Sequence, residues 1–198
     1  MGWVFNFFVM KQDVLELDAV YHIFNRGNNR ENIFFEEKNY LYFLELVKKH
    51  ILPIADIYAY CLLPNHFHIL LKIKDEKEIH LKYREKPHLP FSNLFNAYAK
   101  AINKLYSRRG SLFQEHLKRK RTIDEKYFVH VLAYIHLNPV RHGFTDKFIT
   151  YPYSSYKAFV SNKKTNIDKK TVFGMIDSTS FEYWHHQRVV GLENIMDL

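Results

Sequence analysis

The sequence has little cysteine, and this limits how the fold is stabilised. Cys61 is the single cysteine among 198 residues, so a disulfide framework within the chain is excluded. A chain without disulfides is typical of a reducing compartment, and we expect a cytoplasmic protein. Cys61 itself lies in an apolar, strand-like stretch, which favours a small core residue over a nucleophile.

Long apolar runs are also missing. No stretch approaches the ~20 consecutive apolar residues of a transmembrane helix. The apolar stretch at residues 3–9 is short, has no basic region before it and no small-residue cleavage site, so it is not expected to be a signal peptide. We therefore expect no membrane partner, and no role is assigned to residues 1–12.

Apolar and basic residues, in contrast, are plentiful. The composition is 47% hydrophobic and 17% aromatic, which predicts a packed core rather than disorder. The net charge is +8, from 29 Lys and Arg against 21 Asp and Glu. Such a charge indicates a polyanionic partner, most often nucleic acid, although a merely basic surface is an equally common explanation.

The apolar pattern predicts an α+β fold. Strands have period-2 or continuous apolar runs and helices have period-3.6 spacing. The expected order is β-α-β-β-α-β-α, over residues 20–26, 40–51, 57–63, 66–73, 91–105, 112–121 and 124–138. This order is that of a ferredoxin-like or RRM-like antiparallel sheet, with helices packed on one face, plus an extra C-terminal helix and tail. Residues 75–90 are expected to form a loop.

The same pattern suggests how the chain is divided. Residues 1–150 are expected to form one domain, with a core at about residues 18–143. After Gly143 the periodicity weakens, and residues 151–198 are expected to be an appendage that packs on the domain or on DNA.

Two histidines stand two residues apart in the strand 66–73. Residues i and i+2 of a strand point to the same face, so His66 and His68 project together while Phe67 and Ile69 point into the core. Paired imidazoles on the uncovered face of a sheet are a candidate metal site. The commoner alternative is a purely structural histidine pair.

The last predicted helix has one polar face. At ~100° per residue, Tyr134 and Asn138 fall close to one line, whereas the apolar residues of the helix lie on the opposite side. His136 lies about 200° from Tyr134 and is a poor candidate for the same site. Pro139 is expected to end the helix.

This polar face has a chemical use. Two imidazoles, an amide oxygen and water form a mixed nitrogen and oxygen site that suits Mg²⁺ or Mn²⁺. A phenol is a weak nucleophile at neutral pH, but a metal that polarises a phosphodiester assists its attack and leaves a covalent phosphotyrosine. The alternatives are a tyrosine that only packs and an asparagine that only marks a helix end.

Basic residues near these elements are candidate DNA contacts. Lys118, Arg119, Lys120 and Arg121 follow one another in a predicted strand and suit phosphates. Arg26 and Arg30 flank a turn that could read unpaired bases. Each of these residues could equally be a solvated surface charge.

Several blocks of the sequence resemble a known family. They are residues 21–28 (YHIFNRGN), 63–70 (LPNHFHIL), 110–114 (GSLFQ), 134–141 (YIHLNPVR) and 153–156 (YSSY). The sequence resembles the HUH single-tyrosine transposases (IS200-like), and within them the REP-associated tyrosine transposases. Asparagine at position 138 favours this branch, since the insertion-sequence branch has glutamine.

The resemblance implies a site and a reaction. It implies that His66, His68 and Asn138 are metal ligands and Tyr134 is the nucleophile, with Asn25 and Arg141 among the DNA-binding residues. It implies DNA transposition and recombination by cleavage and rejoining of single-stranded hairpin DNA through a 5′-phosphotyrosine, with no nucleotide cofactor.

Some alternatives stay open at this point. Tyr98 and Tyr106 lie in a region that also carries tyrosines in the family. A non-catalytic single-strand-binding module on an RRM-like sheet, or a metal hydrolase that uses activated water, would share much of the pattern. The chain could be a homodimer or a monomer, and Tyr134 could serve its own metal site or that of a partner.

Overall fold

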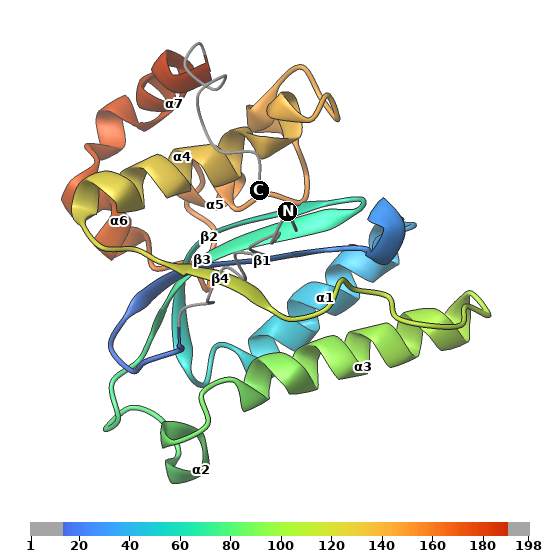
Figure 1. The fold of residues 1–198 in the computed structure, drawn as a ribbon. Coiled ribbons are helices and arrows are strands. Elements are labelled where there is room, and N and C mark those ends of the chain that lie inside the picture. Colours follow the sequence, from blue (N-terminus) through green and yellow to red (C-terminus); the bar gives the residue numbers. More distant parts are fainter. Residues whose placement is uncertain (1–13, 190–198) are drawn as a thin grey trace, which may run out of the picture.

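The computed structural model describes residues 14–189, which form a four-stranded sheet with helices on both faces (Figure 1). The strands are β1 (Val20–Arg26), β2 (Ala55–Leu63), β3 (His66–Ile73) and β4 (Lys118–Arg121), in the spatial order β2-β3-β1-β4. Every neighbouring pair is antiparallel. The predicted α+β class and antiparallel sheet are confirmed.

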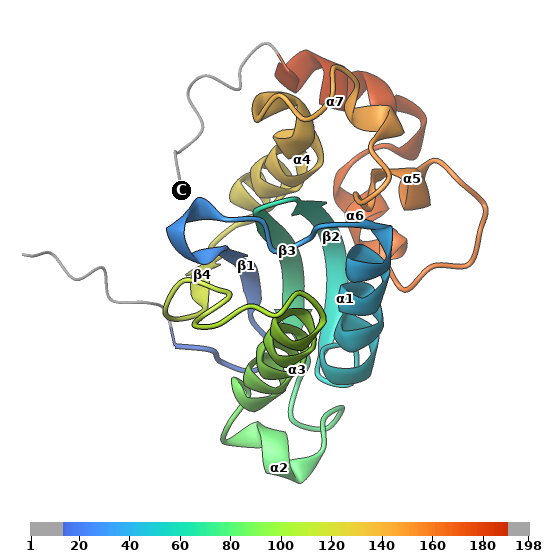
Figure 2. The ribbon, with the colours of Figure 1, turned by 90° about the vertical axis from the view of Figure 1, so that its right-hand side faces the viewer.

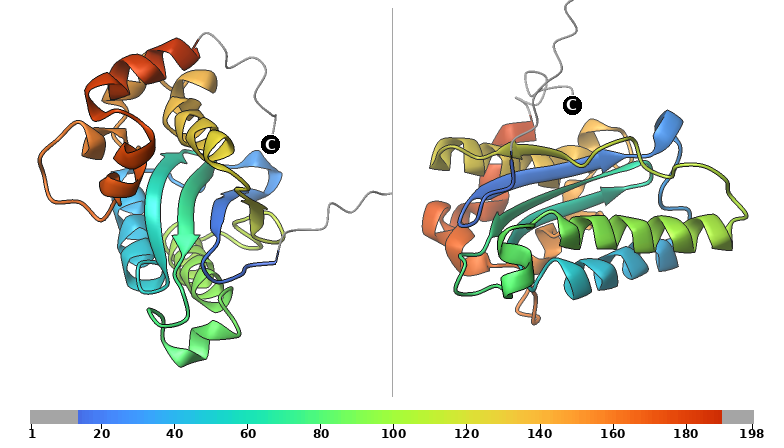
Figure 3. Two further views of the ribbon diagram at one scale, coloured as in Figure 1. Left: turned by 90° about the vertical axis from the view of Figure 1, so that its left-hand side faces the viewer. Right: turned by 60° about the horizontal axis from the view of Figure 1, so that its bottom comes forward.

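The two long helices α1 (Glu37–His50) and α3 (Leu89–Leu105) lie together on one face, and α4 (Glu125–Arg141) lies on the other (Figures 1 and 3). The shorter helices are α2 (Leu81–Arg84), α5 (Tyr156–Phe159), α6 (Lys169–Met175) and α7 (Phe181–Val189), with 3-10 turns η1 (Asn28–Arg30), η2 (Phe148–Thr150) and η3 (Ser178–Ser180). Helix α7 lies beside α4 (Figure 2). Within the described residues, no helix is both long and apolar enough to cross a membrane.

The alternation along β3 separates the core from the candidate site. Phe67 is fully buried between the sheet and the first helix pair, with its ring 5.2 Å from Phe43 and 5.6 Å from Phe95. His66 and His68 point to the opposite face, but they are only 4% and 3% exposed. The expectation that this face is open is therefore wrong.

The sequence of helix α4 explains why it covers the face of the sheet that carries the histidines. Its apolar side holds Phe128, Leu132 and Ile135, all buried, and Phe128 packs edge-on against Tyr58 of β2 at 5.0 Å. Burial of this apolar stripe packs α4 against the sheet. The polar side of α4 then faces the strand that carries the histidines.

Several predicted boundaries are wrong, and α2 forms within residues 75–90, which were expected to be a loop. The strand predicted for residues 112–121 is reduced to β4 and an isolated bridge between Phe113 and Gly27, because His116 adopts a left-handed φ of 63° and interrupts the strand between them. Pro139 does not end α4, which continues to Arg141. A proline removes one N–H and one helical hydrogen bond, and here the loss falls in the last turn.

The segment after η2 pairs with the outer edge of β2. The Tyr151 hydroxyl donates to the Leu62 carbonyl at 2.9 Å, and the Leu62 N–H donates to the Tyr153 carbonyl at 2.9 Å. Tyr153 also stacks on Tyr40 of α1 with ring centroids 3.6 Å apart. These contacts attach the C-terminal helices to the sheet edge.

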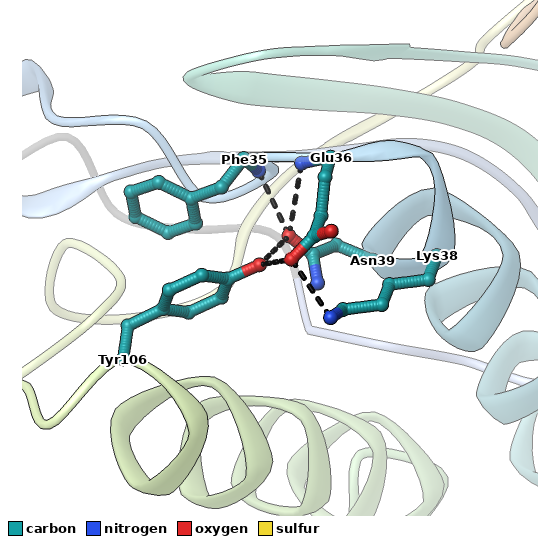
Figure 4. A network of polar contacts seen from close by, with 5 residues as sticks. All are labelled: Phe35, Glu36, Lys38, Asn39 and Tyr106. Atoms are coloured by element: carbon teal, nitrogen blue, oxygen red, sulfur yellow. Dashed lines mark hydrogen bonds and ion pairs between the residues drawn. The ribbon is translucent and has the colours of Figure 1, made fainter.

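A polar network far from the histidines joins α1 to α3 (Figure 4). Asn39 Oδ1 accepts from the backbone N–H groups of Phe35 (2.9 Å) and Glu36 (3.2 Å). The Tyr106 hydroxyl, just after α3, donates to Glu36 and lies 3.1 Å from Asn39 Oδ1. Lys38 Nζ lies 2.9 Å from Glu36 Oε1.

Candidate active site

A cavity of about 330 Å³ opens between α4 and the sheet, at the end of β1 and the start of β3. Its walls come from four parts of the chain that are distant in sequence. The lining residues are Phe24, Asn25, Arg26, Arg30, His66, His68, Gln114, Lys118, Tyr134, Arg141 and His142.

His66 is fixed by partners on both ring nitrogens. Its Nδ1 lies 2.6 Å from Asn65 Oδ1 in the tight turn before β3. Its Nε2 lies 3.0 Å from Asn138 Oδ1 on α4. Strand β3 and helix α4 therefore meet within one chain, through a histidine and an asparagine that the sequence analysis named as candidate ligands.

His68 is held by a third histidine. Its Nδ1 lies 2.9 Å from His22 Nε2 on the neighbouring strand β1. Its Nε2 is buried and has no hydrogen-bond partner among the described residues. His22 was not predicted from the sequence, because only the β1–β3 register, which pairs Phe24 with His68, places it diagonally beside His68.

Burial keeps these imidazoles neutral. Desolvation, with a smaller effect of nearby His142, lowers the pKa of His66 to about 3. Desolvation and the charge of Lys120 lower the pKa of His22 to about 3. The pKa of His68 is also well below its ordinary value because the ring is buried. Neutral imidazoles have a lone pair available for a cation.

The polar atoms left over in this cluster fit a cation. A neutral His66 carries one proton, yet both of its partners are amide oxygens, so one of the two contacts brings lone pairs together. The buried Nε2 of His68 also has no partner in the described part of the chain. A cation near His66 Nε2, His68 Nε2 and Asn138 Oδ1 would relieve this mismatch.

Asn138 Oδ1 is the candidate third donor beside the two imidazoles. In residues 14–189, no group of three or more His, Cys, Asp or Glu side chains could hold a metal ion. Two imidazoles and an amide oxygen form a set without thiolate, which suits a hard or borderline divalent cation rather than a structural zinc site.

Tyr134 lies beside the same histidines. Its ring is 5.3 Å from that of His68 and 6.0 Å from that of His22, and the Arg141 guanidinium lies 5.5 Å from its centre. The two other candidate tyrosines lie outside the cavity. Tyr98 donates to the Ile33 carbonyl at 2.8 Å, and Tyr106 belongs to the network of Figure 4.

The four consecutive basic residues do not form one patch. Successive side chains of a strand point to opposite faces, so Lys118 lines the site cavity while Arg119 lines a different cavity of about 800 Å³ beside α3. Lys120 lies 5.1 Å from the Tyr127 ring, and Arg121 pairs with Glu16 at 2.6 Å. Asn25, Arg26, Arg30 and Arg141, in contrast, line the site cavity.

Two more cavity residues were missed. Gln114 and His142 lie in a loop and just after a helix, where neither periodicity nor spacing points to a site. Gln114 reaches the cavity because its N–H donates to the Arg26 carbonyl at 2.8 Å.

Comparison with known proteins finds a similar curated protein. No family model matches the chain. A curated relative from Haemophilus influenzae, named as a REP-associated tyrosine transposase, is 32% identical over 107 residues, which are 50% of this chain and 57% of the relative. The chain is similar to the REP-associated tyrosine transposases. It spans a little over half the length of this relative.

The fold is similar to that of a solved structure. A solved structure titled as the REP-associated tyrosine transposase bound to a REP hairpin superposes with a TM-score of 0.59 and 15% identity, over 76% of this chain and 84% of that one. The resemblance found in the sequence is confirmed, and so is the fold that it implies.

Proposed function

We propose that this chain is a divalent-metal-dependent DNA transposase that cleaves and rejoins single-stranded hairpin DNA through a covalent 5′-phosphotyrosine. One observation carries the proposal: α4 brings Tyr134 into one cavity with His66 and His68 of β3, and places Asn138 Oδ1 3.0 Å from His66 Nε2. The similarity to REP-associated tyrosine transposases supports it, since the solved relative is described as bound to a REP hairpin.

The proposed metal ligands are His66, His68 and Asn138, and the proposed ion is Mg²⁺ or Mn²⁺. When bound, such an ion polarises a phosphodiester and offsets the charge that develops on it. Asn65 and His22 orient the two imidazoles from their outer nitrogens. With the proton of each ring on Nδ1, both Nε2 atoms keep the lone pair that a metal ligand needs.

Tyr134 is the proposed nucleophile. Its phenolic oxygen gives up its proton and forms a bond to phosphorus, the bond from phosphorus to the 3′ oxygen breaks, and that oxygen leaves as a hydroxyl after taking up a proton. The 5′ phosphate stays on the tyrosine. Rejoining reverses these steps with a 3′-hydroxyl as the attacking group, so the bond energy is conserved and no nucleotide cofactor is needed.

The proposed DNA contacts fall into two groups. Asn25, Arg26 and Arg30 lie at the end of β1 and can reach bases or phosphates in the cavity, together with Lys118 and Arg141. Lys120, Arg119 and Arg121 lie at the sheet edge and would contact phosphates outside the cavity. We also keep the proposal that residues 1–150 are the catalytic domain and 151–198 an appendage.

The decisive experiment is an adduct assay on a single-stranded hairpin oligonucleotide with Mn²⁺. We expect wild-type protein to form a covalent protein–DNA adduct, and Tyr134→Phe to reduce it by at least 1,000-fold, because phenylalanine has no nucleophilic oxygen. Tyr98→Phe is the matched control and should keep the adduct. An adduct that survives Tyr134→Phe would refute the assignment of the nucleophile.

The same assay separates the competing functions. Cleavage without an adduct would indicate a hydrolase that uses water, and binding without cleavage that ignores chelator would indicate a binding module. Because one chain supplies all four residues, we also propose that Tyr134 acts on its own metal site. A mixture of Tyr134→Phe and His66→Ala proteins should then form no adduct.

A further inference from the structure

A chain of buried hydrogen bonds holds α4 from the side opposite the proposed site. The His185 ring of α7 lies 2.9 Å from His136 of α4, through Nε2 and Nδ1. His136 Nε2 lies 2.8 Å from the Ser155 hydroxyl, which accepts from the Tyr60 N–H of β2 at 2.8 Å. His136 and His185 are fully buried and Ser155 is 1% exposed.

The proton positions in this chain follow from chemistry. His185 Nδ1 lies 2.8 Å from the Phe181 carbonyl, an acceptor, so this nitrogen must carry the proton. In a neutral ring His185 Nε2 then accepts from His136 Nδ1, and His136 Nε2 accepts from the Ser155 hydroxyl. Each donor in this chain then has an acceptor: Ser155 donates to His136, His136 donates to His185, and His185 donates to a backbone carbonyl of α7.

Such a network fixes the orientation of a helix, which apolar packing alone does not. Apolar contacts are non-directional, whereas buried hydrogen bonds have one good geometry and are costly to break. On a helical wheel, His136 lies about 200° from Tyr134 and from Asn138. A rotation of α4 by about 20° would move an atom ~6 Å from its axis by about 2 Å, more than the ~0.5 Å that a reactive arrangement tolerates.

We propose that His136 is a positioning residue: it links β2 to α7 through Ser155 and His185, and so fixes the rotation of α4 that places Tyr134 and Asn138 at the histidines of β3. This proposal rests on the proposed function. It gives the C-terminal helix a role, because α7 supplies the last acceptor of the chain.

The test compares His136→Leu with Leu132→Ala, a buried apolar residue of the same helix. Both variants are measured at a temperature where each is folded. Their effects are compared at equal loss of melting temperature. Three properties are followed: Mn²⁺ affinity by electron paramagnetic resonance, the single-turnover rate of adduct formation at saturating DNA, and the ring ¹⁵N signals of His66 and His68 without metal or DNA.

We expect His136→Leu to weaken Mn²⁺ binding and slow adduct formation by at least 10-fold, and to shift both ring signals. Leu132→Ala should leave all three nearly unchanged at equal loss of melting temperature. His136→Gln, which can donate and accept, should recover most of the loss, and Ser155→Ala should reproduce it in part.

The outcomes separate positioning from simple stability. If Leu132→Ala changes these properties as much as His136→Leu does, or if His136→Leu changes none of them, the proposal is wrong. If wild-type protein forms no adduct but the ring signals still respond to His136→Leu, the proposed function fails and the positioning role stands.

Discussion

At the residue scale, the site depends on two contacts behind the proposed metal ligands. His66 is backed by the adjacent residue Asn65, and His68 by His22 of another strand. A ligating histidine usually donates its outer N–H to a carboxylate, a carbonyl or water. Here a neutral imidazole takes that place for His68, since burial lowers the pKa of His22.

Replacing His22 should therefore weaken metal binding without removing a ligand. We expect His22→Leu to raise the Mn²⁺ dissociation constant by about 10- to 100-fold, because His68 loses the acceptor that fixes its tautomer. His22→Gln retains an acceptor and should lose much less. Titration of Mn²⁺ by electron paramagnetic resonance measures both, and equal constants for the two variants would contradict a hydrogen-bonding role.

The basic residues of β4 offer a second test at this scale. Lys118 lines the site cavity, whereas Arg121 is paired with Glu16 on the far edge. Lys118→Ala should weaken hairpin binding and reduce the slope of log affinity against log salt by about 0.7 to 0.9, while Arg121→Ala should change it less. Fluorescence anisotropy over a salt series gives both slopes, and a larger effect at Arg121 would place the DNA elsewhere.

Residue identity and spacing predicted part of this site. Strand alternation placed His66 and His68 together, and the helical wheel placed Tyr134 with Asn138. His22, Gln114 and His142 could not be found in that way, because their positions depend on strand register and loop path rather than on local periodicity.

At the scale of elements, boundaries were harder to predict than element types. The strands 20–26 and 66–73 were predicted with their observed bounds. Residues 112–117 have an apolar, strand-like composition, but they keep only an isolated bridge from Phe113 to Gly27, and the left-handed backbone at His116 separates this bridge from β4. The prediction of an open face was wrong because it counted α4 as an extra helix outside the sheet packing, whereas α4 packs on the second face of the sheet.

The start of α1 gives a prediction at this scale (Figure 4). Asn39→Ala removes the acceptor of two backbone N–H groups and should lower the free energy of unfolding by about 1 to 2 kcal/mol. Asn39→Asp keeps an acceptor oxygen and should cost less. Urea unfolding measures stability, and Mn²⁺ affinity should stay unchanged, since this network lies on the opposite face of the sheet from the histidines.

At the scale of the whole molecule, buried histidines link stability to pH. Burial lowers the pKa of His22 and His66 to about 3 and that of His185 to about 4, and it holds His68 and His136 well below their ordinary value. An unfolded chain binds protons at these rings below a pKa of about 6.5, but the folded chain does not. Stability is therefore complete above pH 6.5 and falls as the pH is lowered toward the folded pKa values.

The size of this effect predicts acid unfolding. Each such histidine costs about 1.4 kcal/mol per pH unit, so five together remove on the order of 7 kcal/mol at pH 5.5, comparable to the ~5–15 kcal/mol of a typical domain. We expect metal-free protein to unfold cooperatively between about pH 6 and 5, followed by circular dichroism in the presence of chelator. His185→Gln should reduce the slope of unfolding free energy against pH by about 1.4 kcal/mol per unit, whereas His88→Gln, at an exposed position, serves as the control. A flat profile between pH 7.5 and 5.5 would show that these rings are already protonated in the folded chain, and the neutral imidazoles that the proposed metal site requires would then be absent.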